Sequence, residues 1–297
     1  TQTSRGLGDV YKRQVLDLKI TDSRRRLFSR YPLMYIGGGL LLIMVFLAVF
    51  APLLFTSDPI QMNPVERLKT PSLTHWFGTD MFGRDIYSRT VYGSRISLVV
   101  GLVAAVLSVI LGLFIGLVAG YIRFLDAILM RIMDGLMAIP GILLAIALVS
   151  LSGASLITVT IAITIPEIPR VVRLVRSIVL SVREEPYVEA AIAAGTRLPL
   201  ILSRHVLPNT IPPLIVQATY VCGSAMLTEA ILSFLGAGTP PEVPSWGNIM
   251  AEGRLYFQIA PWIIFFPGIT LAVTVLAVNV LGDGLRDTLD PRIAKQM

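Results

Sequence analysis

The chain alternates long apolar stretches with shorter polar segments. A helix needs about 20 predominantly apolar residues to cross the hydrocarbon core of a bilayer. Stretches of that length occur at roughly 33–55, 96–122, 127–150, 154–175, 210–236 and 260–282. The pattern predicts an all-α, polytopic membrane protein with six transmembrane helices.

Proline and glycine mark two further features of these stretches. Pro140 interrupts the third stretch and predicts a kink there, because proline removes a helical hydrogen bond. Gly112, Gly116 and Gly120 recur every four residues, which places them on one face of a helix. Such a stripe lets helix backbones approach closely, so we interpret it as packing within the chain.

Composition agrees with a membrane protein. The 297 residues are 54% hydrophobic and 15% charged, with a mean hydropathy of +0.74, whereas soluble domains carry about 25% charged residues. The net charge of +6 comes from basic residues near the N-terminus and at 170–204. That distribution fits the positive-inside rule and not a nucleic-acid interface. The single cysteine, Cys222, excludes an internal disulfide and a multi-cysteine metal site.

Charge also predicts the orientation. Arg24, Arg25, Arg26 and Arg30 precede the first stretch and indicate a cytoplasmic N-terminus. Six crossings then return the C-terminus to the same side and place the loop after the fourth stretch in the cytoplasm. The family resemblance described below further implies the inner membrane of a bacterium or archaeon. One segment opposes this orientation, because the outer loop 56–95 also carries basic residues: Arg67, Lys69, Arg84, Arg89 and Arg95.

The chain divides into four parts by these criteria. Residues 1–14 show no periodicity and have the character of a non-native, adapter-derived tail, so we exclude them from the fold. Residues 15–32 form a cytoplasmic N-terminal segment. Residues 33–95 hold the first transmembrane helix and an extracytoplasmic loop. Residues 96–297 form the core, with five transmembrane helices and a polar loop at about 184–209.

That polar loop, EEPYVEAAIAAGTRLPLILSRHVLPN, predicts a surface for a partner. Pro186 suits the first turn of a helix, and Gly195 can close that helix in a left-handed conformation. Thr196 is a candidate cap for a second helix, which Pro208 is expected to end. The first helix has an alanine-rich side with little bulk, which can enter a groove on another protein. The alternative is an amphipathic loop lying on the membrane.

The spacing of this loop resembles the EAA loop of ATP-binding-cassette importer permeases. Glu189-Ala190-Ala191 is followed four residues later by Gly195, and Leu207-Pro208 comes twelve residues after the glycine. The family pattern often has isoleucine where this chain has His205. Four further segments carry the resemblance: HWFGTDMFGRDIYSRTVYGSRISL (75–98), RIMDGLMAIPGILLAIAL (131–148), EAILSFLGAGTPPEVPSWGNIM (229–250) and NVLGDGLRDTLDPR (279–292).

Together these segments are similar to the dipeptide/oligopeptide/nickel permease family, and to its shorter, C-type subunit. The resemblance implies a type I, MetI-like permease fold and import of peptides or related small ligands. It implies that this subunit pairs with a homologous permease subunit and that an extracytoplasmic binding protein delivers the ligand. It also implies two cytoplasmic ATPase subunits, which hold ATP and Mg²⁺ and dock on the EAA loop. The residues implied in coupling are Glu185, Pro186, Tyr187, Glu189, Ala190, Ala191, Gly195, Arg204, His205, Leu207 and Pro208.

Independently of the resemblance, the chain contains no G-x-x-x-x-G-K-[ST] phosphate loop. We therefore expect it not to be an enzyme and to bind no cofactor or metal of its own. Its histidines, His75 and His205, are far apart in the predicted topology and give no support for a nickel site.

Several charged residues near or within the apolar stretches are open to two interpretations. Glu229 lies among apolar residues, so it either lines the transport pathway or pairs with the partner permease. Arg170, Arg173 and Arg176 have the spacing of a voltage sensor but also suit a cytoplasmic extension of the fourth helix. Two local ion pairs are predicted, Arg131 with Asp134 and Glu167 with Arg170.

Two other classes of transporter remain alternatives. A secondary transporter driven by an ion gradient would show repeated halves and deep functional charges. We find no internal repeat in the sequence and few deep charges. An ion channel would need a selectivity filter or a ring of pore charges, and neither is visible.

Overall fold

A computed structural model of the chain describes residues 32–240 and 242–289. The α-helices in these ranges are α2 (Pro32–Val49), α3 (Ile86–Tyr121), α4 (Arg123–Ala138), α5 (Gly141–Ser152), α6 (Leu156–Arg183), α7 (Pro186–Ala193), α8 (Leu198–Ile201), α9 (Leu207–Phe234), α10 (Trp246–Gly253) and α11 (Trp262–Leu289). Short 3-10 helices occur at Ala51–Leu53, Pro64–Glu66 and Arg254–Tyr256, and a π-helix at Leu202–Val206. The predicted tail 1–14 and the arginines before the first helix lie outside the described residues.

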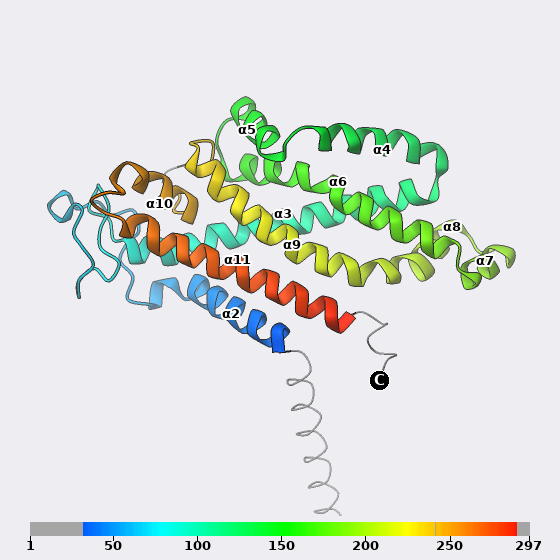
Figure 1. The fold of residues 1–297 in the computed structure, drawn as a ribbon, viewed down its shortest axis with the longest axis horizontal. Coiled ribbons are helices and arrows are strands. Elements are labelled where there is room, and N and C mark those ends of the chain that lie inside the picture. The colour runs from blue at the N-terminus through cyan, green and yellow to red at the C-terminus, as the bar shows by residue number, and fades with distance from the viewer. Residues whose placement is uncertain (1–31, 241, 290–297) are drawn as a thin grey trace, which may run out of the picture.

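The long helices run lengthwise through the molecule (Figure 1). In the centre α3 packs against both α6 and α9, and α11 joins α9 to α2. The helices α4 and α5 lie against α6, on the side of the bundle away from α2 and α11. The described part of the chain is therefore a helical bundle, as predicted.

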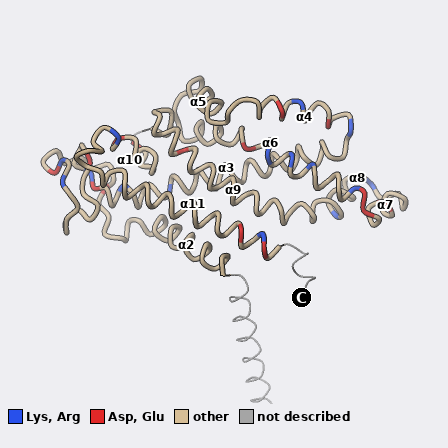
Figure 2. The backbone as a smooth tube through the Cα atoms, viewed as in Figure 1, with Lys and Arg blue, Asp and Glu red and all other residues tan. Residues whose placement is uncertain are grey.

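The two ends of the bundle differ. One end carries α7 and α8 and is called here the α7 end; the other carries α10 and the loop 50–85 and is called the α10 end (Figure 1). Charged residues gather toward these ends and on α4 and α6, while long parts of α2, α3, α9 and α11 carry none (Figure 2). Long uncharged helical stretches of this kind are what the interior of a bilayer requires.

The helices match the predicted spans except in two places. Within the part of the chain that the structure describes, four helical segments are long and apolar enough to cross a membrane: Pro32–Val49, Ile86–Tyr121, Leu198–Phe234 and Trp262–Leu289. A fifth exists if α4 and α5, which meet at a bend of 89°, count as one broken span. The remaining predicted span, 154–175, corresponds to the 28-residue α6, whose apolar character is interrupted from Glu167 onward. The structure thus does not establish six spans by length and composition.

The predicted kink at Pro140 is a break between two helices. α4 ends at Ala138, and α5 begins at Gly141 in a new direction. Pro140 itself stands at the N-cap of α5, where its carbonyl accepts the first hydrogen bonds of the new helix, from Leu143 and Leu144. The predicted kink is therefore confirmed, and it is sharp enough to divide the stretch 127–150 into two helices.

The first core helix begins ten residues earlier than the predicted boundary at 96. The carboxylate of Asp85 accepts a hydrogen bond from the backbone N–H of Ser88 at 2.8 Å and caps the N-terminus of α3. The first turns of α3 include Arg89 and Arg95, which lowered the apolar character on which the prediction rested. Both arginines have partners within the protein, so these turns remain helical.

The glycine stripe is a packing seam between α3 and α6, as predicted. A β-carbon added at Gly112, Gly116 or Gly120 would come within 2.5 to 2.7 Å of the β-carbon of a valine on α6. The three valines, Val171, Val175 and Val179, are fully buried. Each glycine thus faces one valine, and the two backbones approach closely.

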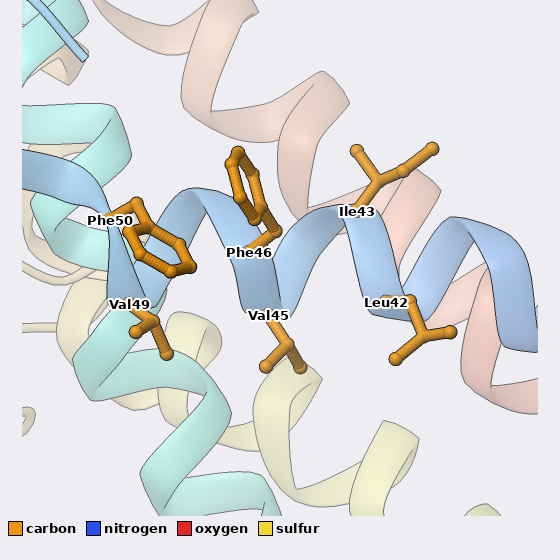
Figure 3. A pocket seen from close by; sticks show the side chains of 6 residues that line it. All are labelled: Leu42, Ile43, Val45, Phe46, Val49 and Phe50. Carbon is orange, nitrogen blue, oxygen red and sulfur yellow. The ribbon is translucent and has the colours of Figure 1, made fainter. Parts of the chain in front are cut away.

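Among the described residues, α2 packs against α11 and α3. Gly37 lies against the backbone of Leu281 in α11, and Gly284 of α11 lies against the backbone of Met34. Arg95 of α3 donates hydrogen bonds to the carbonyls of Ala48 and Val49 and thereby satisfies the C-terminal end of α2. The other side of α2 is an apolar surface groove lined by Leu42, Ile43, Val45, Phe46, Val49 and Phe50 (Figure 3).

Candidate functional site at the α7 end

The predicted polar loop forms a short helix that projects from the bundle (Figure 1). Pro186 occupies its first position, as predicted, and Glu185 precedes it as the N-cap residue. Within α7 the side chain of Val188 is fully buried, whereas Glu189 and Ala190 are exposed. The helix therefore presents an acidic residue beside a small one on a surface that is open to a partner.

Gly195 ends α7 in the predicted left-handed conformation, with φ of +74°. The N–H of Gly195 donates to the carbonyl of Ile192 at 2.9 Å, and the N–H of Thr196 donates to that of Ala191 at 3.1 Å. This pair of bonds is the Schellman motif, which satisfies the last carbonyls of a helix. The glycine thus fixes the direction in which the chain leaves α7.

The second half of the loop differs from the prediction. Thr196 does not cap the next helix; Arg197 precedes α8 and makes no side-chain cap. Pro208 does not end a helix either, because it lies in the first turn of α9, and a helical path runs from Leu198 to Phe234. Directly before Pro208 the backbone widens into the π-helix Leu202–Val206. A widened turn relieves the clash that proline makes with the preceding turn.

Side-chain contacts join α7 to the beginning of α9. Asn209 donates from its side-chain amide to the Tyr187 hydroxyl at 3.2 Å and to the carbonyl of His205 at 2.6 Å. The rings of Tyr187 and His205 lie 6.0 Å apart. The structure therefore brings together Tyr187 and His205 from the predicted set, through Asn209, which the prediction did not single out. Arg204 and Pro208 are exposed, and Leu207 is partly buried.

Glu229 lies at the other end of α9 and is fully buried. Its carboxylate accepts hydrogen bonds from Ser233 at 2.9 Å and from Ser245, the residue that caps α10, at 2.8 Å. Ser245 in turn caps the backbone of Asn248, whose amide binds the carbonyls of the loop 239–243. Glu229 thus joins α9 to α10 within this chain, and the two roles predicted for it stay predictions.

Each of the three regularly spaced arginines on α6 has an acidic partner. Arg176 makes two hydrogen bonds to Asp126 of α4 at 2.5 and 2.7 Å, and Arg173 binds Asp134 of α4 at 2.6 Å. Arg170 lies 3.2 Å from Glu167, which confirms that predicted pair. The predicted pair of Asp134 with Arg131 was wrong, because the Asp134 carboxylate binds Arg173 on the neighbouring helix α6. These ion pairs join α4 to α6.

A buried charge cluster at the α10 end was not predicted as a unit. Arg89 is only 1% exposed and binds Asp80 at 2.8 Å and Glu252 of α10 at 2.5 Å. Arg84 binds the same two acids. Two arginines and two carboxylates thus balance one another and tie the start of α3 to α10. The signal in the sequence was the presence of unexplained basic residues in the loop 56–95.

His75 joins two acids in the same region. Its ring nitrogens lie 3.0 Å from Asp85 and 2.5 Å from Glu66. Partial burial lowers the pKa of His75, but the hydrogen bonds to Asp85 and Glu66 outweigh burial and raise this pKa above its usual value. Hydrogen bonds from Lys69 and His75 lower the pKa of Glu66. Among residues 32–240 and 242–289, no cluster of three or more His, Cys, Asp or Glu side chains is arranged to hold a metal ion.

The sequence is similar to known permease subunits. A family described as "Binding-protein-dependent transport system inner membrane component" matches residues 108–295, and one described as "N-terminal TM domain of oligopeptide transport permease C" matches residues 21–71. A probable peptide ABC transporter permease protein of Sinorhizobium fredii is 59% identical over 267 residues, which cover 90% of this chain and 91% of that protein. A dipeptide transport system permease protein of Alkalihalophilus pseudofirmus is 48% identical, over 86% and 85% of the two chains.

The fold is similar to that of a solved transporter. An inward-facing structure of the MetNI methionine ABC transporter superimposes with a TM-score of 0.56 over 68% of this chain and 96% of the other, at 19% identity. This likeness shows the MetI-like permease fold that the sequence predicted.

Proposed function

Because the chain belongs to the family of binding-protein-dependent transport system inner membrane components, we propose that it is one of two permease subunits of a peptide importer. The substrate class is di- or oligopeptides or a related small ligand, as the names of its relatives suggest. The subunit pairs with a homologous permease, and an extracytoplasmic binding protein delivers the ligand to the pair. The chain spans the cytoplasmic membrane with both termini in the cytoplasm.

The observation that carries this proposal is α7, an exposed helix at one end of a bundle of long apolar helices. The chain has no phosphate loop, so ATP and Mg²⁺ bind to two separate ATPase subunits. These subunits dock on α7, with the exposed Glu189 as a charged contact and Ala190 as part of a smooth surface. Pro186 and Ala191 belong to this docking helix, Glu185 precedes it as the N-cap residue, and Gly195 fixes the direction in which the chain leaves it. Movement of the ATPases then opens the pathway between the two permeases.

The ion pairs at the α10 end support the proposed orientation. The positive-inside rule counts the basic residues of the loop 56–95 against an extracytoplasmic location. In the folded protein Arg84 and Arg89 are paired with Asp80 and Glu252, and Arg95 binds carbonyls of α2. These three of the segment's five basic residues therefore have structural partners, which account for them without a cytoplasmic location.

Reconstitution of the complete importer in proteoliposomes tests the proposal. We expect ATP-driven uptake of labelled peptides that requires the binding protein. Glu189→Ala should weaken co-purification of the ATPases at least tenfold, because a charged interface contact is lost. Glu184→Ala is the matched control, since Glu184 is an exposed acid just before α7 and should leave assembly unchanged. Uptake without ATP but driven by an ion gradient would instead establish a secondary transporter.

A further inference from the structure

The attachment of α7 to the bundle depends on few side chains. Val188 is the buried residue of α7, and it belongs to the same apolar cluster as Ile201 of α8 and Val206 of the π-helix. The rest of α7 is partly or fully exposed. One buried side chain allows a short helix to rock about that point, so a second contact is needed to fix its direction.

Asn209 supplies that second contact. It lies in the first turn of α9, and its side-chain amide bridges the Tyr187 hydroxyl on α7 and the carbonyl of His205 in the π-helix. The bond to Tyr187 connects residues 22 positions apart in the chain. Asn209 therefore holds together three pieces of backbone: the docking helix, the widened turn and the beginning of α9.

The widened turn gives this contact its position. In the π-helix the N–H of Leu207 donates to the carbonyl of Leu202, five residues back, and Pro208 has no N–H to donate. The Asn209 amide reaches the carbonyl of His205, which lies within this π-helix. The helical path continues unbroken to Phe234, and near its far end Glu229 binds Ser245, which caps α10.

We propose that Asn209 is a positioning residue that transmits movement of α7 to α9. The inference rests on the proposed function, in which ATPase subunits dock on α7. Val188 and the Tyr187–Asn209 hydrogen bond hold α7 at two points, so a displacement of α7 turns or shifts the root of α9 with it. Without the hydrogen bond, α7 still carries its docking surface but rocks on Val188. ATP hydrolysis then proceeds with little effect on the permease.

The stimulation of ATP hydrolysis by the binding protein measures how well movement is transmitted between α7 and α9. In the reconstituted importer, the rate of ATP hydrolysis is measured with and without saturating binding protein. We expect Asn209→Ala to retain the ATPases on purification and to reduce stimulation by the binding protein at least fivefold. Ser203→Ala is the control, because exposed Ser203 lies in the same π-helix and contacts the carbonyl of Leu200 instead of α7. It should keep wild-type stimulation.

A double-mutant cycle with Tyr187→Phe identifies the hydrogen bond. The double variant should be no worse than Asn209→Ala alone, because each change removes the same interaction. Additive losses, or wild-type stimulation in Asn209→Ala, would overturn the inference. Loss of the ATPases from purified Asn209→Ala would also overturn it, since the residue would then support docking and not transmission. A wild-type complex without any ATP-driven uptake or stimulation would refute the proposed function itself.

Discussion

Gly116 of α3 lies directly against Val175 of α6, so that a β-carbon on the glycine would be 2.7 Å from the valine β-carbon. The same relationship repeats at Gly112 and Gly120, one helical turn away in each direction. Real β-carbons do not approach so closely, so the seam admits only glycine at these positions without a shift of the helices. In a bilayer, where burial of apolar surface drives helix association little, such close packing is a main source of stability.

Replacement of Gly116 by alanine is therefore expected to destabilise the protein. The added methyl group must push α3 away from α6, at a cost of about 1–3 kcal/mol. Gly135→Ala in α4 is the matched control, because a β-carbon there has no neighbour within 4 Å. Thermal unfolding of the purified protein in detergent measures both. Equal melting temperatures for the two variants would contradict the packing explanation.

The buried charge cluster at the α10 end predicts that removal of one of its charges strongly destabilises the protein. Arg89→Met leaves Asp80 and Glu252 with Arg84 as their shared partner, so one carboxylate is poorly compensated. Removal of one partner from a buried ion pair costs about 3–5 kcal/mol. Lys69→Met removes an exposed partner of Glu66 and should have a much smaller effect on stability, because exposed ion pairs contribute little. Chemical denaturation of both variants measures the two losses of stability. Equal losses would contradict a stabilising role of the buried cluster.

The raised pKa of His75 predicts a stability that depends on pH. Protonated His75 stabilises the loop through Glu66 and Asp85, so its contribution is complete below the unfolded pKa of about 6.5. The contribution is lost as the pH rises through the higher folded pKa. His75→Gln should remove this dependence, which melting curves at a series of pH values above about 6 can detect. Parallel curves for wild type and variant would show that another group titrates.

Gly195 predicts a contrast between two substitutions. Its φ of +74° is costly for most residues but is accessible to asparagine, and no atom would contact a β-carbon there. Gly195→Asn should therefore retain most of the binding of the ATPase subunits, whereas Gly195→Val should lose it through strain of about 1–2 kcal/mol or more. Co-purification with the ATPases measures both. An equal loss of ATPase binding in the two variants would indicate that the ATPase occupies the space beside Gly195, so that any side chain there prevents docking.

Local features of this chain could be predicted from its sequence. The α7 helix and the left-handed turn at Gly195 follow from proline, glycine and their spacing, because these residues act through the backbone nearby. The seam at Gly116 follows from a four-residue period. The family could be recognised because several motifs occur in one order over most of the chain.

Features that depend on neighbouring helices could not be predicted. Asp134 was assigned to Arg131, three residues away, but its carboxylate reaches Arg173 on α6. The burial of Glu229 depends on Ser245, sixteen residues later, which is brought to it by the fold of the loop before α10. The π-helix arises where Pro208 meets a helix that continues, and a rule that proline ends helices misses it.

The position of Glu252 in the chain has a consequence for biosynthesis. Arg89 is synthesised 163 residues before this partner, and α4, α5, α6 and α9 come between them. During synthesis the loop 50–85 and the start of α3 therefore exist for a long interval with Asp80 as the one acid of the cluster. The α10 end of the bundle can therefore close only after α10 has been made, when the start of α3 and all of α9 already exist.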